Sequence, residues 1–463
     1  MRNINGSALL VSAAFVLAAC SNAGDGANAG SALPLINQPG MLAPQPVARQ
    51  RVRHRTSSNP IQHVIIIVQE NRSFNDLFEG FPGATTASSG ELSNGTTVQL
   101  AQIGLATTWD LEHDSTGFFD SCNGTGSIPG TNCQMNGFNK EYAGCGDDCP
   151  TKYPEYAYVP QSETKPDWDI AKQYALADQM YASNLDASSF ISHQYIIAAQ
   201  AEASVNFPFD SWGCSSGSGN LIYKIGPSRQ VPYGYQEPCY GDTSLGEEAD
   251  SAGVTWAFYT STINGDGGIW SAYQANKYVY YGSDWKSDII TPQTDFFSDV
   301  TNGKLRQISW ITPTCENSDH AGCNSDTGPS WVASLVNAIG ESQYWNNTAI
   351  FIFWDDYGGW YDPEPPAYVD YDGLGMRIPM IVVSAYAKKH YISETPYEHG
   401  SILRFAEDTF GLPRLSASDS RANSPADCFD FKKKPRKYKK IEAPYSRWYF
   451  LHQPADTRMP DYE

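Results

Sequence analysis

Two pairs of oxygen-bearing residues follow apolar runs of strand length. Glu70-Asn71 comes just after Val64–Val68, and Asp355-Asp356 comes directly after Ile350–Trp354. All four side chains offer hard oxygen ligands, and three carboxylates brought together repel one another unless a cation neutralises them. Each pair alone is weak evidence, because an Asp-Asp pair before Gly358-Gly359 also fits a strand end followed by a turn. Together the two pairs favour a site for one divalent metal ion.

One serine is a candidate nucleophile. Ser189 lies in the segment DASSFISHQYIIAAQ, just before a predicted helical run from Gln194 to Ala201. The first turn of a helix presents free N–H groups and a positive end-field, which suit an anionic substrate and a hydroxyl that loses its proton. The alternative is that Ser189 only caps the helix.

Two histidines could transfer protons or bind anions. His320 follows Asp319 in WITPTCENSDHAG, soon after another apolar run, and His113 lies in the loop sequence DLEHD. A single histidine in a loop is more often a surface residue than a catalytic one. A catalytic role for either histidine therefore depends on whether the fold brings it to the other candidate residues.

The scaffold must bring strand ends together. Apolar runs of strand length recur at Val64–Val68, Val254–Tyr259, Ile308–Thr312, Ala349–Trp354 and Ile378–Ser384. Apolar residues at helical spacing lie between or after them, from position 331 to 339 and from 402 to 410, with a glycine at 411 as a stop. This alternation predicts an α/β fold with a largely parallel sheet flanked by helices, in which ligands bind at the carboxyl ends of the strands.

The amino terminus resembles a bacterial lipoprotein signal peptide. Residues 1–20 contain Arg2, a short apolar stretch from Ala8 to Ala19, and a lipobox-like end at Cys20. Cys20 would carry the lipid anchor to the membrane, and Ser21 resembles the pattern for the outer membrane. An ordinary signal peptide with a chance cysteine is the alternative. Residues 21–60 are predicted to be a flexible tether, so we expect an exported lipoprotein of the outer membrane or periplasm.

The remaining chain divides into a catalytic region and a tail. Residues 61–425 are predicted to form the main domain, within which residues 205–300 are rich in aromatic residues and are expected to be an insertion or cap. Residues 426–463 contain the basic run FKKKPRKYKK, which is interpreted as a solvated surface segment or as a contact with anionic lipid.

The cysteines and the charge limit the class of protein. Cysteines after Cys20 fall in close pairs, 122 with 133, 145 with 149, 214 with 239 and 315 with 323, and Cys428 is left over. Export favours disulfides that fix long loops, although spacing alone cannot prove the connectivity.

The net charge of −20 argues against nucleic-acid binding. The oligomeric state is not determined by the sequence.

The chain resembles a bacterial phosphoesterase family of phospholipases C and acid phosphatases, which has an alkaline-phosphatase-like fold. HVIIIVQENRSFNDLFEGFPG is similar to its opening strand and ENRSF motif, and SFISHQY is similar to its nucleophile segment. ENSDHAG resembles the segment that ends in an active-site histidine. AIFIFWDDYGGWYDPEPP resembles the strand that ends in an acidic pair, and RIPMIVVSAYAKKHYISETPYEHGSILRFAEDTFGLPRL resembles the closing strand and helix.

The resemblance implies a role for each matching residue. One metal ion of unknown identity would be held by Glu70, Asn71, Asp355 and Asp356, with Ser189 as the nucleophile. Catalytic roles pass to His320, His113 and Asp319, where Asp319 would orient His320 or contact the metal-side network. Substrate-binding roles pass to His399, His193 and Tyr357. The chain departs from the family at Tyr357, where the family often has histidine, and at Asn136, where it has aspartate.

The sequence therefore predicts a metal-dependent phosphoesterase that acts through a phosphoserine intermediate. Its substrate would be a phospholipid or other diester, as for a phospholipase C, or a phosphate monoester, as for an acid phosphatase. An alternative is a non-catalytic surface lipoprotein that keeps the fold and binds a glycan or a protein partner.

Overall fold

The computed structural model describes residues 59–209, 211–261, 268–456 and 458. The predicted signal peptide, Cys20 and nearly all of the predicted tether lie outside these residues. Within the described ranges, no helix is both long and apolar enough to cross a membrane.

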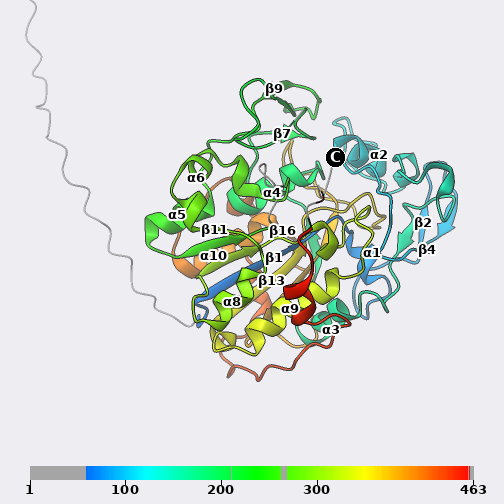
Figure 1. Cartoon of the computed structure of the whole chain (residues 1–463). Helices are drawn as coiled ribbons and strands as arrows, with labels where there is room; N and C mark the ends of the chain where they lie inside the picture. Colours follow the sequence, from blue (N-terminus) through cyan, green and yellow to red (C-terminus); the bar gives the residue numbers. More distant parts are fainter. Residues whose placement is uncertain (1–58, 210, 262–267, 457, 459–463) are drawn as a thin grey trace, which may run out of the picture. The chain divides into compact units, whose positions relative to one another are not determined.

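A nine-stranded sheet forms the centre of the described chain (Figure 1). Its order is β11 (Ile289–Ile290), β10 (Trp256–Tyr259), β12 (Ile308–Ile311), β1 (His63–Gln69), β13 (Thr348–Trp354), β14 (Arg377–Ser384), β6 (Ala175–Tyr181) and β15 (Tyr391–Ser393), and β16 (Tyr397–Glu398) also pairs with β6. All these pairings are parallel except those that β14 makes with β13 and β6. The sheet is therefore α/β and largely parallel, as predicted.

Apolar composition explains why the middle strands lie inside. Every residue from Val64 to Val68 is fully buried, and β13 and β14 are buried along their whole length. Continuous apolar runs of this kind are typical of strands covered on both faces. The five predicted strands are confirmed, with boundaries that differ by one or two residues.

Helices cover both faces of the sheet (Figure 1). On one side are α4 (Ser189–Ala198), α5 (Leu245–Ala252) and α10 (His399–Phe410), and on the other are α3 (Lys165–Gln173), α8 (Asp295–Thr301) and α9 (Gly328–Gly340). The predicted helices at 331–339 and 402–410 are confirmed, and Gly411 ends α10 in a left-handed conformation with φ 74°. The predicted run from Gln194 to Ala201 was wrong in its start, because α4 already begins at Ser189.

Shorter elements lie around this core. The remaining helices are α1 (Phe74–Phe78), α2 (Ser115–Cys122), α6 (Lys277–Tyr281), α7 (Asp284–Ser287), α11 (Ala417–Arg421) and α12 (Arg447–His452). The remaining strands are β2 (Ser89–Glu91), β3 (Thr97–Gln99), β4 (Ala101–Gln102), β5 (Ala157–Tyr158), β7 (Ser204–Val205), β8 (Ile222–Lys224) and β9 (Gly234–Gln236). Short 3-10 turns occur at Phe138–Lys140, Gly146–Asp148, Ala272–Ala275, Cys315–Asn317, Trp345–Asn347 and Pro425–Cys428.

The region 205–300 is only partly an insertion. β7, β8 and β9 form a separate small sheet, which fits the expectation of an added structure. However, β10 and β11 belong to the edge of the central sheet, so the later part of this region completes the core. β10 corresponds to the predicted strand Val254–Tyr259, which lies inside the range expected to be an insertion.

The carboxyl-terminal segment is packed onto the domain, although its lysines are mostly exposed. Phe429, Ile441 and Phe450 are buried. Phe450, in α12, places its ring 5.3 Å from that of Trp331 in α9. Residues 426–456 therefore contribute to the core, and the basic run is the exposed part of a folded segment.

The four predicted disulfides are all present. They join Cys122 to Cys133, Cys145 to Cys149, Cys214 to Cys239 and Cys315 to Cys323. Cys428 is a buried free thiol. The bonds span 4 to 25 residues and lie outside the strands of the central sheet, as expected for disulfides that fix loops.

Candidate active site

The two strand ends that were predicted from the sequence to carry the site lie side by side in the sheet. β1 and β13 are parallel neighbours, and Gln69 is paired with Trp354. The next residues are therefore Glu70-Asn71 on one strand and Asp355-Asp356 on the other. The Asn71 backbone N–H donates to Asp355 Oδ1 at 3.0 Å, and the Arg72 N–H donates to the Asp356 carbonyl oxygen at 3.1 Å.

The close approach of the backbone at Asn71 explains the glycine at position 358, after the acidic pair. Asn71 has a φ of 56°, in the left-handed region that asparagine tolerates better than most residues. Gly358 has a φ of 60°, and a Cβ there would lie 2.2 Å from the Asn71 carbonyl oxygen. Any side chain at 358 would displace the Asn71 backbone, so Gly358 is required by the site geometry.

Glu70, Asp355 and His193 form a buried group, which is called the acidic cluster below. The His193 Nε2 atom lies 3.3 Å from Glu70 Oε1 and 3.7 Å from Asp355 Oδ2. One ligand atom from each residue lies within 4.8 Å of the others, and all three side chains are buried. His193, predicted to bind substrate, thus lies among the predicted metal ligands.

The acidic cluster fits a divalent cation. Glu70, Asp355 and Asp356 are all 0% exposed, and burial of several carboxylates without positive charge is costly. Asp355 Oδ2 accepts no hydrogen bond from the residues that the structure describes. Oxygen ligands with one imidazole nitrogen suit several divalent ions. Asp356 Oδ1 accepts the Gly358 N–H at 2.7 Å, which fixes its carboxylate beside the same turn.

Ser189 lies at the first position of α4, with Ser188 as the N-cap residue. Its hydroxyl donates a long hydrogen bond of 3.4 Å to Asn71 Oδ1. The Ser188 hydroxyl instead lies 3.2 Å from Asp186 Oδ2 and 3.1 Å from the Asn206 carbonyl oxygen. The two serines are thus distinguished by geometry, because Ser189 bonds to the Asn71 side chain whereas Ser188 bonds to Asp186 and Asn206.

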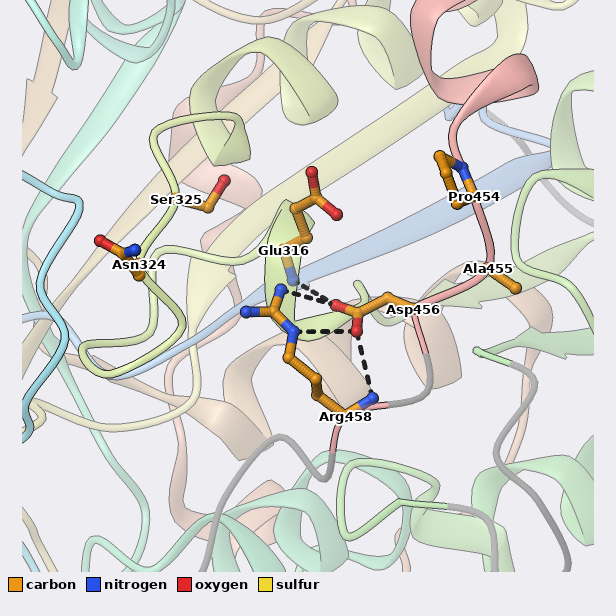
Figure 2. A pocket seen from close by; sticks show the side chains of 7 residues that line it. All are labelled: Glu316, Asn324, Ser325, Pro454, Ala455, Asp456 and Arg458. Atoms are coloured by element: carbon orange, nitrogen blue, oxygen red, sulfur yellow. Dashed lines mark hydrogen bonds and ion pairs between the residues drawn. The ribbon is translucent and has the colours of Figure 1, made fainter.

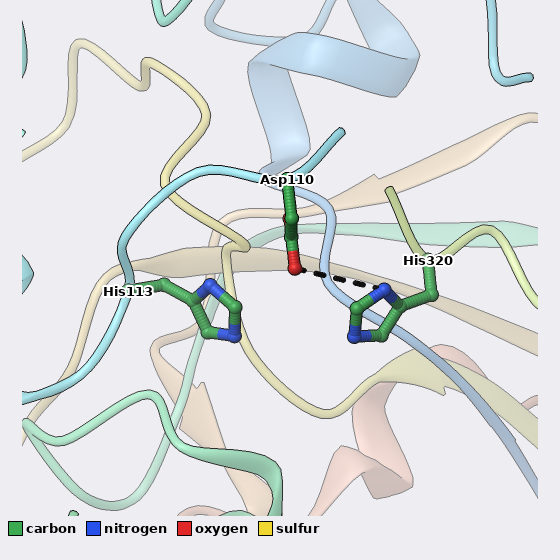
Figure 3. Close-up of side chains that lie close together, drawn as sticks. All are labelled: Asp110, His113 and His320. Carbon is green, nitrogen blue, oxygen red and sulfur yellow. Dashed lines mark ion pairs between the residues drawn. The ribbon is translucent and has the colours of Figure 1, made fainter. Parts of the chain in front are cut away.

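His113 and His320 lie on the other side of the Asn71 amide. Asn71 Nδ2 is 2.9 Å from His113 Nε2 and 3.0 Å from His320 Nε2. The side chain of Asn71 therefore joins the predicted nucleophile to both predicted catalytic histidines. Asp110, which precedes His113 in the DLEHD loop, places Oδ2 3.8 Å from His320 Nδ1 (Figure 3).

Asp319 is bonded to Trp354 and Arg72. Its Oδ2 accepts the indole N–H of Trp354 at 2.9 Å, and its backbone carbonyl accepts from Arg72 Nε at 2.7 Å. Burial raises the pKa of Asp319 to about 7. We expected Asp319 to orient His320 or contact the metal-side network. The carboxylate with a contact to the His320 ring is that of Asp110, whereas Asp319 contacts Trp354 at the end of β13 and Arg72 just after β1.

Tyr357 and His399, both predicted to bind substrate, are fully enclosed. The Tyr357 hydroxyl donates to Glu141 Oε1 at 2.9 Å and lies 3.2 Å from Ser121 Oγ. His399 starts α10 with its ring 5.5 Å from that of Phe353, and burial lowers its pKa to about 4. The lowered pKa disfavours the positively charged form that would attract an anionic substrate.

Asp110 and Trp270 are contributions that the sequence did not reveal. Asp110 belongs to the same DLEHD motif as His113, so that motif was the available signal. Trp270, from the region expected to be a cap, is buried with its ring 5.6 Å from that of His320. Only the tertiary fold brings residue 270 to residue 320.

The loop that carries His320 is held from behind by the carboxyl-terminal segment. Asp456 Oδ2 accepts the Glu316 N–H at 2.9 Å, and Arg458 donates to the Cys323 carbonyl oxygen at 2.8 Å. These contacts border a hollow of about 390 Å³ (Figure 2), which contains none of the residues around Asn71. We therefore regard this hollow as a structural junction and not as the substrate site.

Comparison with known proteins identifies the family. Residues 61–413 match the model of the Phosphoesterase family, so the chain belongs to that family. Similar proteins include a non-hemolytic phospholipase C of Burkholderia pseudomallei, 22% identical over 76% of this chain and 55% of the relative. Phospholipase C A of Mycobacterium tuberculosis is 24% identical over 76% of this chain and 73% of its own. The chain spans about half or less of the length of the first relatives it matches.

Solved structures with a similar arrangement are distant. One is a protein of the alkaline phosphatase superfamily from Vibrio parahaemolyticus, with 10% identity, a TM-score of 0.35, and coverage of 80% of this chain and 72% of that one. Another is murine ectonucleotide pyrophosphatase/phosphodiesterase 5, with 8% identity, a TM-score of 0.35, and coverage of 58% and 95%.

Proposed function

We propose that this protein is a metal-dependent phosphoesterase that hydrolyses phosphate esters through a phosphoserine at Ser189. The observation that supports it most is the position of Asn71. Its amide contacts the Ser189 hydroxyl on one side and His113 and His320 on the other, while its backbone is tied to Asp355. Membership of the Phosphoesterase family supports the phosphoester bond as the target.

The ligands of the ion would be Glu70, Asn71, Asp355 and Asp356, with His193 as an addition suggested by its contacts. When bound, the divalent ion supplies positive charge that favours the ionised serine and the phosphoryl oxygens. The buried carboxylates hold that charge in place, and Gly358 lets the two strand ends approach closely enough to do so.

Ser189 would attack phosphorus while the bond from phosphorus to the leaving oxygen breaks, which leaves a phosphoserine and an alcohol. The first turn of α4 presents free N–H groups toward an anion at this position. Water would then attack the phosphoserine and release phosphate or a phosphorylated alcohol, which restores the Ser189 hydroxyl.

His320 would give its Nε2 proton to the leaving oxygen, and His113 with the start of α4 would bind the other phosphoryl oxygens. The placement of Asp110, 3.8 Å from His320 Nδ1, supports it as the partner of His320 in place of Asp319. Trp270, with its ring 5.6 Å from that of His320, would cover this side of the site.

The substrate is a phospholipid-type diester or a monoester. The similar proteins are named phospholipases C, which favours the diester and a lipid substrate. Such a substrate agrees with the predicted anchor at Cys20, which would keep an exported enzyme beside a membrane. The acidic surface gives no support for nucleic acid as a partner.

An activity screen tests the proposal. The purified protein should hydrolyse a chromogenic phosphomonoester or a phosphocholine diester, lose activity with a chelator, and recover it when a divalent ion is restored. Brief incubation with substrate followed by acid should yield a phosphorylated peptide that contains Ser189. Failure to cleave either ester in the presence of divalent ions would instead favour the non-catalytic binding protein.

A further inference from the structure

A strongly basic segment lies at the edge of the central sheet opposite the candidate active site. Nine of the chain's 31 lysines and arginines fall within residues 388–389 and 432–440, although the whole chain has a net charge of −20. The rest of the chain is therefore still more acidic. This segment is called the basic edge below, and its exposed members are Lys389, Lys432, Lys433, Lys434, Lys437, Lys439 and Lys440.

The sheet pairing fixes the position of the basic edge. The starts of β1 and β13 and the end of β14 lie together at one edge of the sheet. Arg436 donates its backbone N–H to the Ala385 carbonyl oxygen at 3.0 Å, just after β14, and its own carbonyl oxygen accepts the indole N–H of Trp345 at 2.7 Å, just before β13. Because a parallel strand rises about 3.3 Å per residue, the seven residues of β13 place this edge roughly 20 Å from Asp355. In Figure 1 the basic run is the reddish loop along the lower margin, whereas α4, which begins with Ser189, lies in the upper half.

The basic run is held against the domain by side chains that alternate with its lysines. The Arg436 guanidinium donates to the Gln173 carbonyl oxygen at 2.8 Å. The ring of Tyr438 lies 4.9 Å from that of Trp345, and Ile441 is buried. The exposed lysines are thus presented to solvent by a folded segment, so that little backbone freedom would be lost when a partner binds them.

Most of this positive charge is not neutralised by neighbouring side chains. Lys433 Nζ lies 3.1 Å from Asp430 Oδ2. The other exposed members of the basic edge form no ion pair with the residues that the structure describes. Their charge is therefore available to attract an anionic surface.

The chain that leads to the predicted lipid anchor leaves the domain at the same edge. The side chain of Asn59, the first residue described, donates to Thr409 Oγ1 at 3.3 Å, and the Gln62 N–H donates to the Asn347 carbonyl oxygen at 2.7 Å, just before β13. Cys20 precedes Asn59 by 39 positions in the sequence. A lipid at Cys20 would raise the effective concentration of this edge at the surface that holds the lipid.

We propose that the basic edge docks onto an anionic lipid surface, and that the active site consequently opens away from the membrane that carries the anchor. Lysines within a Debye length of anionic headgroups are attracted to them, whereas the acidic remainder of the chain is repelled. The docking face does not depend on the proposed activity, but the direction of the site rests on the proposed function. An enzyme held in this way would take esters that reach it from the side opposite its own membrane.

Flotation with vesicles tests the docking face without relying on turnover. The full chain with Cys20→Ala, which removes the predicted lipid, is mixed in the presence of a chelator with vesicles of phosphatidylcholine, with or without phosphatidylglycerol. Two triple variants neutralise parts of the basic edge: Lys432→Gln with Lys433→Gln and Lys434→Gln, and Lys437→Gln with Lys439→Gln and Lys440→Gln. The matched control neutralises three exposed lysines outside the basic edge, Lys152, Lys165 and Lys277.

Binding to the anionic vesicles should exceed binding to the neutral vesicles and should fall as the salt concentration rises. Each basic residue near an anionic surface contributes about fivefold to the binding constant, so each edge variant should bind roughly 100-fold more weakly than the control. Equal binding to both kinds of vesicle, or an equal loss in the control, would overturn the docking face. Self-association that the edge variants abolish, without vesicle binding, would instead assign the face to a second copy of this chain.

The lipidated wild-type protein tests the direction of the site. It is bound to anionic vesicles and acetylated at its lysines, and the modified positions are measured by mass spectrometry against detergent-solubilised protein. The lysines of the basic edge should be protected, whereas Lys165, at the end of α3 remote from Gln173, should react as in detergent. Protection of Lys165 with a reactive basic edge would overturn the orientation. Ester hydrolysis in the solubilised sample reports separately on the proposed function.

Discussion

The Asn71 backbone N–H donates to Asp355 Oδ1 across 3.0 Å, which ties the ends of β1 and β13 to each other. One carboxylate of the acidic cluster thereby fixes the residue whose side chain contacts Ser189, the proposed nucleophile, and both His113 and His320. Metal binding and orientation of Ser189 are therefore expected to fail together when Asp355 is changed.

Asp355→Asn should remove the ion held by the acidic cluster and nearly all turnover, while the protein stays folded. An asparagine can still accept the Asn71 N–H through its amide oxygen, but it lacks the negative charge that binds the cation. Elemental analysis, turnover and circular dichroism should be measured on this variant and on Glu70→Gln. Unchanged metal content in both variants would contradict the assignment of these ligands.

Ser189→Ala should lower turnover by roughly 10³-fold or more, because the covalent route is lost. Ser188→Ala is the matched control. It removes a buried hydroxyl that contacts Asp186 and Asn206, so it should cost about 1 kcal/mol of stability and keep most activity. Both quantities should be measured on both variants. Near-normal turnover in folded Ser189→Ala would refute the nucleophile.

Stability should fall as the pH rises, partly because of Glu407 in α10. Burial raises the pKa of Glu407 to about 9, and the neighbouring Asp419 acts in the same direction. Arg414, 2.6 Å away, opposes the shift but does not reverse it, because the buried carboxyl is less well solvated than the half-exposed guanidinium. The folded state therefore holds a proton that the unfolded chain releases near pH 4.5.

The sign of this effect can be checked with Glu407→Gln. The stabilisation present below about pH 4.5 is lost progressively toward pH 9, because the folded state binds more protons than the unfolded state in that range. A glutamine at 407 has no proton to release, so the unfolding free energy of Glu407→Gln should improve relative to wild type as the pH rises from 5 to 9. Urea unfolding at several pH values measures this, and parallel curves would contradict it.

Cys20→Ala should release the protein from the membrane fraction or leave its signal peptide uncleaved. The motivation is the lipobox-like run that ends at Cys20. Fractionation and intact-mass measurement compare the variant with wild type. A wild-type amino terminus without lipid, found in the membrane fraction all the same, would rule out this anchor.

Removal of the Cys315–Cys323 disulfide should reduce turnover by about tenfold to a hundredfold, because small displacements of a catalytic group are costly. This bond closes the loop that carries His320, with a separation of 8 residues. The double variant Cys122→Ala/Cys133→Ala is the control, since it opens a loop of similar size outside the Asn71 contacts. Equal activity in the two double variants would argue against a specific effect on His320.

The sequence was most informative where local composition decided the structure. The β-branched run before Glu70 and the aromatic run before Asp355 can only be buried strands, so the meeting of their ends was predictable. β6 escaped prediction because Asp178 interrupts its apolar pattern. That carboxylate pairs with Arg377 at 3.2 Å, and a partner almost 200 residues away cannot be read from the sequence around Asp178.

The same limit explains the differences within the site. Asp319 is adjacent to His320 in sequence, but the chain turns so that its carboxylate meets Trp354, and Asp110 approaches His320 from another loop. Tyr357 follows the acidic pair, yet its hydroxyl is taken by Glu141. Motifs predicted which segments meet, whereas the direction of each side chain depended on backbone turns that no motif specifies.

The Cys315–Cys323 bond also has a consequence for the cell that makes this protein. Thiols stay reduced in the cytoplasm, so a newly made chain would lack the covalent closure of the His320 loop until it was exported. The phosphoesterase activity that we propose would then be low where the chain is synthesised and would mature only after export. If the proposed substrate is a phospholipid, this delay would keep the lipids of the cytoplasmic face out of reach of the active form.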